Sequence, residues 1–217
     1  MTGILGGTFN PVHFGHLRAA EEVRAALGLD SVIFIPASRP PHKTQEIAGA
    51  AHRMNMVRAA ISGNPAFSAS DMEINRPDIS YSVNTLEELR RLRPGHEFCF
   101  ILGMDAFLEL ASWKSPDRVV SLADIAVITR PPYRFGELAA SPFLKGLDAG
   151  MLAAMDSGGG KTVSVRMMSG RSAHVVPVTA MDISSTAIRR ILKSGGSVRY
   201  LLPEEVASYI LFNKLYQ

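Results

Sequence analysis

The sequence has little cysteine and no long apolar stretch, and each absence excludes a class of protein. Its single cysteine, Cys99, cannot form an intramolecular disulfide, which excludes a disulfide-stabilised secreted domain. Cys99 lies in the apolar run 98–102, which predicts a buried thiol rather than a nucleophile. No stretch reaches the roughly 18 consecutive apolar residues of a membrane span, and no basic segment precedes an apolar one near residue 1. We therefore expect a cytoplasmic protein with no membrane partner.

The chain also lacks a strong charge of either sign. Its 23 Lys and Arg residues against 20 Asp and Glu residues give a net charge of +3. The basic residues are dispersed and no aromatic residues alternate with a basic stripe, which disfavours a nucleic-acid-binding module. Apolar residues make up 47% of the chain and charged residues 20%, the balance of a globular domain. The slight positive excess suits phosphate-bearing ligands without identifying one.

Short β-branched runs alternate with helical stretches, which predicts a Rossmann-like, doubly wound α/β fold with helices on both faces of the sheet. We expect a mainly parallel sheet of five or six strands. The predicted strands cover 3–5, 31–35, 67–70, 97–102 and 125–129, with late candidates at 163–167 and 174–178. The predicted helices cover 16–27, 48–62, 83–93, 105–111, a stretch opened by Ser115 and Pro116, 183–193 and 204–213. The pattern weakens over 136–170. With no repeat or boundary evident, we expect one domain over 1–217, its C-terminal helical part packing on the rest from about residue 183.

A glycine- and histidine-rich segment, residues 6–16, joins the first predicted strand to its helix. Gly6 and Gly7 allow the backbone to approach a ligand closely. A helix beginning near His16 directs unpaired N–H groups to the same place, which makes an anion site. His13 and His16 add two further hydrogen-bonding groups. An ordinary strand-to-helix turn is one alternative, and a zinc site on the two histidines is another that would need a third ligand.

A second segment, residues 183–190, places hydroxyl side chains just before a helical run. Ser184 and Ser185 are typical helix N-caps, because their oxygens accept hydrogen bonds from the first N–H groups of a helix. A phosphate site at the same helix end is compatible with that role. Arg190 is expected to face solvent or to pair with a partner.

Both segments resemble signatures of the nucleotidyltransferase superfamily with a Rossmann-like core. The first matches G-x-F-x-P-x-H-x-G-H, and the second resembles I-S-S-T-x-I-R from Ile183 to Arg189. The resemblance implies three catalytic residues that hold the ATP phosphates, His13, His16 and Arg189. It implies further ATP contacts at Gly6, Gly7, Thr8, Phe9, Gly15, Ile183, Ser184 and Ser185. Where relatives commonly have Asp, this chain has Asn10, whose amide carries no charge but can still bond a backbone or hydroxyl group.

The segments between these motifs resemble nicotinate mononucleotide adenylyltransferases. They are residues 40–43, 80–86, 102–107, 130–133 and 202–204, together with the single tryptophan. The resemblance implies acceptor contacts at His42, Lys43, Ser82, Val83, Thr85, Asp105, Trp113, Lys114 and Arg130. Trp113 would stack on the pyridine ring, and the backbone N–H groups of Val83 and Lys114 would meet the nicotinate carboxylate. Core packing is the alternative for Trp113, and a helix N-terminal carboxylate is the alternative for Asp105, which would otherwise bond a ribose hydroxyl.

The implied activity is an enzymatic step of NAD biosynthesis, the transfer of AMP from ATP to nicotinate mononucleotide. Mg²⁺ is expected to arrive with ATP, because the sequence shows no dedicated carboxylate cage for a metal. ATP and nicotinate mononucleotide are the expected partners, and a homo-oligomer is compatible with the sequence. A pantetheine-phosphate adenylyltransferase, a cytidylyltransferase and a non-catalytic nucleic-acid-binding module are the alternatives.

Overall fold

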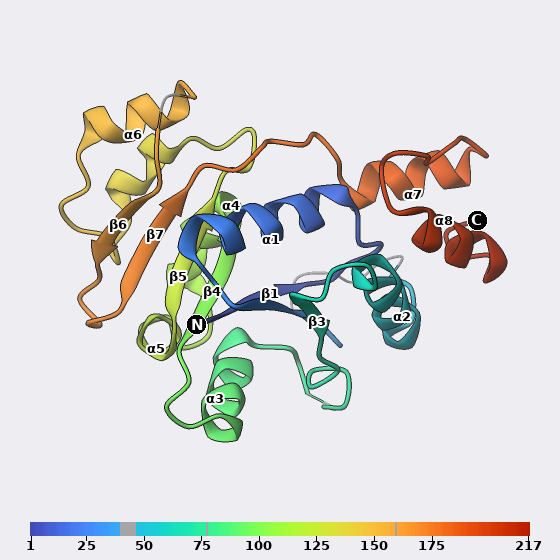
Figure 1. Ribbon diagram of the computed structural model, residues 1–217, viewed down its shortest axis with the longest axis horizontal. Helices are drawn as coiled ribbons and strands as arrows, with labels where there is room; N and C mark the ends of the chain where they lie inside the picture. Colours follow the sequence, from blue (N-terminus) through green and yellow to red (C-terminus); the bar gives the residue numbers. More distant parts are fainter. Residues whose placement is uncertain (40–46, 77, 159) are drawn as a thin grey trace.

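The computed structural model describes residues 1–39, 47–76, 78–158 and 160–217 and shows a twisted sheet with helices on its two faces (Figure 1). The strands follow the order β3-β2-β1-β4-β5-β7-β6, and all neighbours run parallel except β6 and β7. They are β1 (Thr2–Gly7), β2 (Ser31–Pro36), β3 (Phe67–Ala69), β4 (Phe98–Gly103), β5 (Asp124–Ile128), β6 (Val163–Arg166) and β7 (Ser172–Val176). The doubly wound, mainly parallel architecture expected from the sequence is confirmed.

The expected count of five or six strands is wrong, because the described residues form a seven-stranded sheet. Both late candidates, 163–167 and 174–178, are strands of this sheet, and the first of them is β6, an antiparallel edge strand whose side chains alternate between half-buried and exposed. Such a strand has no continuous apolar run, so its sequence gives a weaker indication than a central parallel strand does. Edge strands of this kind commonly complete an otherwise parallel sheet.

The helices fall close to their predicted ranges. They are α1 (Phe14–Leu27), α2 (Ala50–Ile61), α3 (Ser82–Leu92), α4 (Met104–Leu108), α5 (Pro116–Leu122), α6 (Ala149–Asp156), α7 (Ser185–Lys193) and α8 (Glu204–Phe212). Two short 3₁₀ helices, η1 (Leu110–Ser112) and η2 (Phe135–Ala140), complete the set. The predicted helix 105–111 is therefore two pieces, α4 and η1, and α1 begins two residues before the predicted start. None of the helices in the described ranges is long and apolar enough to cross a membrane.

Each face of the sheet has its own apolar core, because successive side chains of a strand point to opposite faces. On β4, Phe98, Phe100 and Leu102 pack with α3, α4 and α5, whereas Cys99 and Ile101 pack with α1, α2, α7 and α8. Cys99 is fully buried, as predicted, and burial raises the pKa of its thiol to about 12. A thiol in this state is a packing group and not a nucleophile.

The chain diverges between β1 and β4, which are neighbours in the sheet. β1 leads into α1 on one face, whereas β4 continues directly into α4 on the other face. In doubly wound sheets, ligands bind in the crevice that this divergence opens at the carboxyl ends of the strands. The two histidines follow β1 at this edge, and Asp105 follows β4.

Candidate active site

The glycines that precede the histidine loop are strand residues, which corrects the predicted end of the first strand. Gly6 and Gly7 pair with Ile35 and Pro36 of β2, so β1 extends to Gly7 and the turn begins at Thr8. Gly6 is exposed, so its backbone remains open to close approach by a ligand.

The turn after β1 brings the two histidine rings together. Their ring centroids lie 3.7 Å apart, and the backbone N–H of His13 donates to Nδ1 of His16 over 3.3 Å. Because this nitrogen accepts a hydrogen bond, a neutral His16 ring carries its proton on Nε2. His16 therefore has an N–H donor on the side of the ring away from the loop backbone, beside the N-terminus of α1.

His13 is buried, with 6% of its surface exposed. Burial, with a smaller contribution from Arg130, lowers the pKa of His13 from 6.5 to about 4, so the ring is neutral at neutral pH. Its Nδ1 is buried and has no hydrogen-bond partner among the residues that the structure describes. An unpartnered buried nitrogen next to a helix N-terminus is available for a hydrogen bond with a ligand.

Close packing fixes the loop around these rings. Phe9 has φ of 46°, a left-handed conformation that costs a non-glycine residue about 1 kcal/mol or more, and its buried ring packs against His16 and Phe34. A side-chain carbon at Gly15 would lie 3.1 Å from the His13 ring. Gly15 therefore leaves space for the imidazole as well as for a ligand.

The start of α7 contacts this loop directly, although it lies more than 170 residues further along the chain. Ser184 caps α7, its Oγ accepting from the N–H of Ala187 over 3.1 Å, as predicted. The Oγ of Ser185 instead donates to the carbonyl of Pro11 over 2.9 Å. Arg189 donates from Nη1 to the carbonyl of Asn10 over 2.9 Å. The two predicted motifs therefore form one structural unit.

Arg189 also retains hydrogen-bonding capacity for a ligand. Its Nε is buried and has no partner within the described part of the chain, while Nη2 lies 3.4 Å from Oγ1 of Thr186. The adjacent Arg190 is exposed, as expected. A guanidinium with an unused buried N–H, beside two helix N-termini, is suited to a phosphate.

A carboxylate–arginine pair lies at the ends of β4 and β5. Oδ2 of Asp105 lies 3.3 Å from Nε of Arg130, and Oδ1 is buried without a partner among the described residues. Asp105 is in the first turn of α4, so it is a helix N-terminal carboxylate that still has one acceptor atom unused. A side-chain carbon at Gly103 would lie 2.6 Å from Oδ1, so a larger residue there would displace the Asp105 carboxylate. Because the positive charge of Arg130 contributes to the lowered pKa of His13, this pair lies near the histidine loop.

A second group of predicted residues lies around the N-terminus of α3. Nζ of Lys114 lies 4.6 Å from the ring centroid of Tyr81, the N-cap residue of α3, and Val83 is buried in the first turn of that helix. Trp113 is half-buried and packs edge-on against Phe100 of β4, with ring centroids 6.4 Å apart. Core packing therefore accounts for part of the Trp113 ring and leaves part of it exposed.

Four further residues are predicted to contact the acceptor: Ser82, Thr85, His42 and Lys43. The hydroxyl of Thr85 is buried, donates to Glu73 over 2.6 Å and accepts from Nη2 of Arg76 over 3.0 Å, so its hydrogen bonds are made within the protein. Its contact with the acceptor stays a prediction, as does that of Ser82, which is half-buried at the start of α3. His42 and Lys43 lie outside the described residues.

A buried arginine, Arg53, joins three segments around the site, and no role was predicted for it from the sequence. It is 1% exposed and donates to the carbonyls of Thr8, Ser38 and Ala48 over 2.8, 3.1 and 2.9 Å, respectively. It therefore ties the histidine loop to the end of β2 and to the start of α2. Its position among apolar residues of α2 was an indication, because a charge on a buried helix face needs a specific partner.

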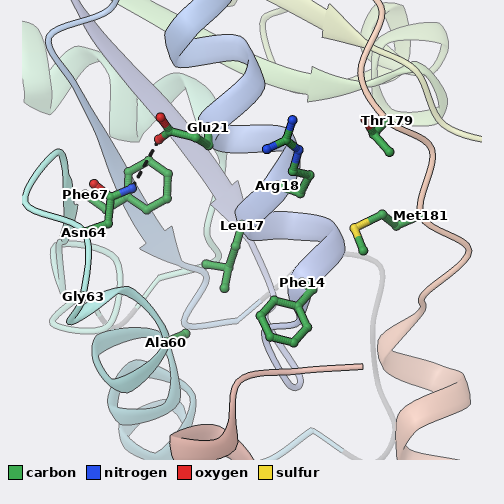
Figure 2. A pocket seen from close by; sticks show the side chains of 10 residues that line it. All are labelled: Phe14, Leu17, Arg18, Glu21, Ala60, Gly63, Asn64, Phe67, Thr179 and Met181. Carbon is green, nitrogen blue, oxygen red and sulfur yellow. Dashed lines mark hydrogen bonds between the residues drawn. The ribbon is translucent and has the colours of Figure 1, made fainter. Parts of the chain in front are cut away.

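A cavity of about 540 Å³ lies along α1 (Figure 2). Its walls come from α1, from the end of α2 with the start of β3, and from the segment after β7: Phe14, Leu17, Arg18, Glu21, Ala60, Gly63, Asn64, Phe67, Thr179 and Met181. None of the predicted site residues that the structure describes lines it. The candidate site is therefore defined by the converging side chains at the carboxyl edge of the sheet.

Asn10 confirms the bonding expected of an amide at its position. Its Oδ1 accepts from the backbone N–H of Ala48 over 3.0 Å and from the hydroxyl of Tyr216 over 2.6 Å. The described residues contain no group of three or more His, Cys, Asp or Glu side chains that could hold a metal ion, so a zinc site on His13 and His16 is not supported.

Comparison with known proteins identifies the family of this chain. The cytidylyltransferase-like family model matches residues 4–191. A protein of Geobacter metallireducens named "Probable nicotinate-nucleotide adenylyltransferase" is 46% identical, with 99% of this chain and 97% of that protein covered. A protein of Geotalea daltonii with the same name is 43% identical at the same coverage.

Solved structures show the same fold at low sequence identity. Plasmodium falciparum nicotinic acid mononucleotide adenylyltransferase complexed with NaAD aligns with a TM-score of 0.74 at 17% identity, covering 99% of this chain and 96% of that chain. The same protein complexed with APC aligns with a TM-score of 0.71 at 16% identity and the same coverage. By sequence and by fold, the chain belongs to the cytidylyltransferase-like family and, within it, to the nicotinate-nucleotide adenylyltransferases.

Proposed function

We infer that this chain transfers AMP from ATP to nicotinate mononucleotide, giving nicotinate adenine dinucleotide and pyrophosphate for NAD biosynthesis. The observation that carries the inference is the contact between the histidine loop and α7, made by Ser185 with Pro11 and by Arg189 with Asn10. This contact places two helix N-termini, an imidazole pair and a guanidinium at one edge of the sheet. The identity of the acceptor is supported by the names of the full-length relatives.

The reaction needs alignment and charge stabilisation rather than a protein nucleophile. A phosphate oxygen of the acceptor attacks the α-phosphorus of ATP, the new P–O bond forms, and the bond to the β-phosphate oxygen breaks as pyrophosphate leaves. His16 Nε2–H, the N-terminus of α1 and Arg189 would stabilise the negative charge that develops on the transferred group and the leaving group. A phosphate oxygen against Nδ1 of His13 would select the neutral tautomer that is protonated there.

The acceptor would lie between the carboxyl ends of β4 and β5 and the N-terminus of α3. Trp113 would stack on the pyridine ring, while the N–H groups of Val83 and Lys114 would bond its carboxylate. The unused Oδ1 of Asp105 would accept from a ribose hydroxyl, and Arg130 would hold Asp105 in place. Ser82, Thr85, His42 and Lys43 remain further proposed contacts for the acceptor.

Mg²⁺ fits this site as an ion carried by ATP. The described side chains offer no metal cage, and Mg²⁺ usually retains water and binds through substrate phosphates. When bound, it neutralises part of the phosphate charge, and the protein would hold the remaining oxygens through Arg189 and the helix N-termini. The single buried thiol supports a cytoplasmic, reducing location as part of the proposal.

The test is pyrophosphate release from ATP with a panel of acceptors. Nicotinate mononucleotide should be used fastest, and phosphopantetheine or a CTP-dependent acceptor should give no reaction above background. Because the Lys114 ammonium would favour the charged nicotinate over its neutral amide, Lys114→Met should reduce that preference several-fold, roughly as the loss of one charge-assisted contact does. Lys145→Met is the matched control, since Lys145 is exposed between η2 and α6. Equal rates for the acid and the amide in the unmodified protein would contradict the Lys114 role, and preference for another acceptor would contradict the function.

A further inference from the structure

The segment after α8 turns back toward the histidine loop. Lys214 and Tyr216 have φ of 50° and 65°, left-handed conformations that are uncommon outside glycine. They direct the chain so that Tyr216 is half-buried beside the apolar core of α1, α2, α7 and α8. Figure 1 shows this end of the chain next to α8 and close to α7.

Tyr216 forms a hydrogen bond with Asn10 of the histidine loop. Asn10 is also bonded to Ala48, just before α2, and to Arg189 of α7. The Tyr216 hydroxyl lies 2.6 Å from Oδ1 of Asn10, and the N–H of Ala48 donates to the same oxygen over 3.0 Å. The backbone carbonyl of Asn10 accepts from Nη1 of Arg189 over 2.9 Å. Asn10 is 4% exposed. It therefore joins the segment after α8, the start of α2 and the α7 arginine.

The direction of the Tyr216 hydrogen bond follows from the chemistry of both partners. An amide oxygen only accepts, and its two lone pairs are used here by the Ala48 N–H and the phenol. Burial raises the pKa of Tyr216, although Arg189 and Arg53 act in the opposite direction. The Tyr216 phenol is thus a neutral donor, and Arg189 and Arg53 lie near enough to affect its pKa.

We propose that Tyr216 is a positioning residue for the triphosphate site, which fixes Asn10 and, through its carbonyl, Arg189. The proposal rests on the proposed function, because it assigns Tyr216 to the ATP side of that reaction. The Asn10 side chain and backbone are held at the same time, so loss of the phenol bond would let the loop shift relative to α7. Trp113, which is assigned to the acceptor, packs against the core on one face of the sheet, whereas Tyr216 packs against the core on the other face.

The test compares Tyr216→Phe with Tyr209→Phe in the pyrophosphate-release assay. Tyr209 is the matched control, because its hydroxyl is bonded to His52 and Asn55 of α2, at 2.9 and 3.0 Å, away from the loop. Tyr216→Phe should lower kcat/KM for ATP about fivefold, as loss of one net hydrogen bond does, and leave KM for nicotinate mononucleotide unchanged. Tyr209→Phe should lower the melting temperature and leave both kinetic constants unchanged.

A double-mutant cycle tests the route through Asn10. Tyr216→Phe should have no further effect on kcat/KM for ATP in an Asn10→Ala background, because the two residues act as one unit. The proposal is overturned if Tyr216→Phe behaves as the unmodified chain, if both Tyr variants lose activity equally, or if the two effects at Tyr216 and Asn10 add. An unmodified chain that is inactive with nicotinate mononucleotide would instead contradict the proposed function.

Discussion

At the scale of single residues, the site depends on polar atoms that are buried before any ligand arrives. Nδ1 of His13, Nε of Arg189 and Oδ1 of Asp105 are each buried without a partner among the described residues. Leaving such an atom unsatisfied costs about 1–3 kcal/mol, so this arrangement is expected where a ligand supplies the missing hydrogen bond. A carboxylate oxygen and two nitrogens of this kind suit a molecule that carries both hydroxyl and phosphate groups.

The neutral state of His13 predicts a dependence of stability on pH. The unfolded chain binds a proton at this ring from about pH 6.5 downward, whereas burial delays protonation in the folded state to about pH 4. Acidification through this window therefore favours the unfolded chain, and the stabilisation present above pH 6.5 is lost by about pH 4, roughly 3 kcal/mol in all. Urea unfolding of the unmodified chain and of His13→Asn at pH 7 and pH 4.5 measures the difference. Identical pH dependence in the two proteins would contradict the lowered pKa.

The groups that would stabilise the developing charge, His16 and Arg189, predict a large loss of rate when either is removed. His16→Ala or Arg189→Ala should raise the barrier by about 3 kcal/mol, roughly a hundredfold in rate, as the loss of one oxyanion donor does. Arg190→Ala serves as the control, because the neighbouring guanidinium is exposed. Turnover close to normal in both site variants would show that neither group acts in the reaction.

At the scale of elements, the sequence predicted where helices and strands lie better than where they end. Gly6 and Gly7 have no side chains to reveal a strand, and only pairing with β2 shows that β1 includes them. The predicted helix 105–111 divides into α4 and η1 because Ser112 and Trp113 close tighter turns on Glu109 and Leu110. The start of α7 was predictable, since Ser184 is a local N-cap. The contact of Ser185 with Pro11 was not, because it depends on how distant segments meet.

At the scale of the whole molecule, the alternation of strands and helices was sufficient to predict the architecture and the edge that carries the site. The histidine loop, Asp105 and Arg130 follow the carboxyl ends of β1, β4 and β5, where a doubly wound sheet binds ligands. Contacts between segments that are far apart in the sequence could not be predicted, because no local sequence pattern indicates them. The bond between Tyr216 and Asn10 spans 206 residues, and that between Arg53 and Thr8 spans 45.

Because Arg53 bonds the histidine loop and the segments after β2 and before α2, we expect it to stabilise both the site and the fold. Arg53→Met removes the donors of three backbone carbonyls, so the free energy of unfolding should fall by about 2–4 kcal/mol even though a buried charge is removed as well. Urea unfolding measures the loss. Arg53→Lys is the comparison, because an ammonium keeps the charge without the planar fork that reaches three acceptors, and it should recover only part of the stability. A change below about 0.5 kcal/mol in Arg53→Met would refute this role.

The docking of Tyr216 on Asn10 also determines which end of the polypeptide tolerates a fusion. β1 begins at Thr2 and reaches the histidine loop only after its six residues, roughly 20 Å of extended chain, so an affinity tag ahead of Met1 leaves from the opposite edge of the sheet. A tag joined after Gln217 would begin one residue beyond the phenol that holds the loop. For immobilisation on a sensor surface, or for display beside a second enzyme, the amino end is therefore the attachment point that leaves the Tyr216 contact with Asn10 undisturbed.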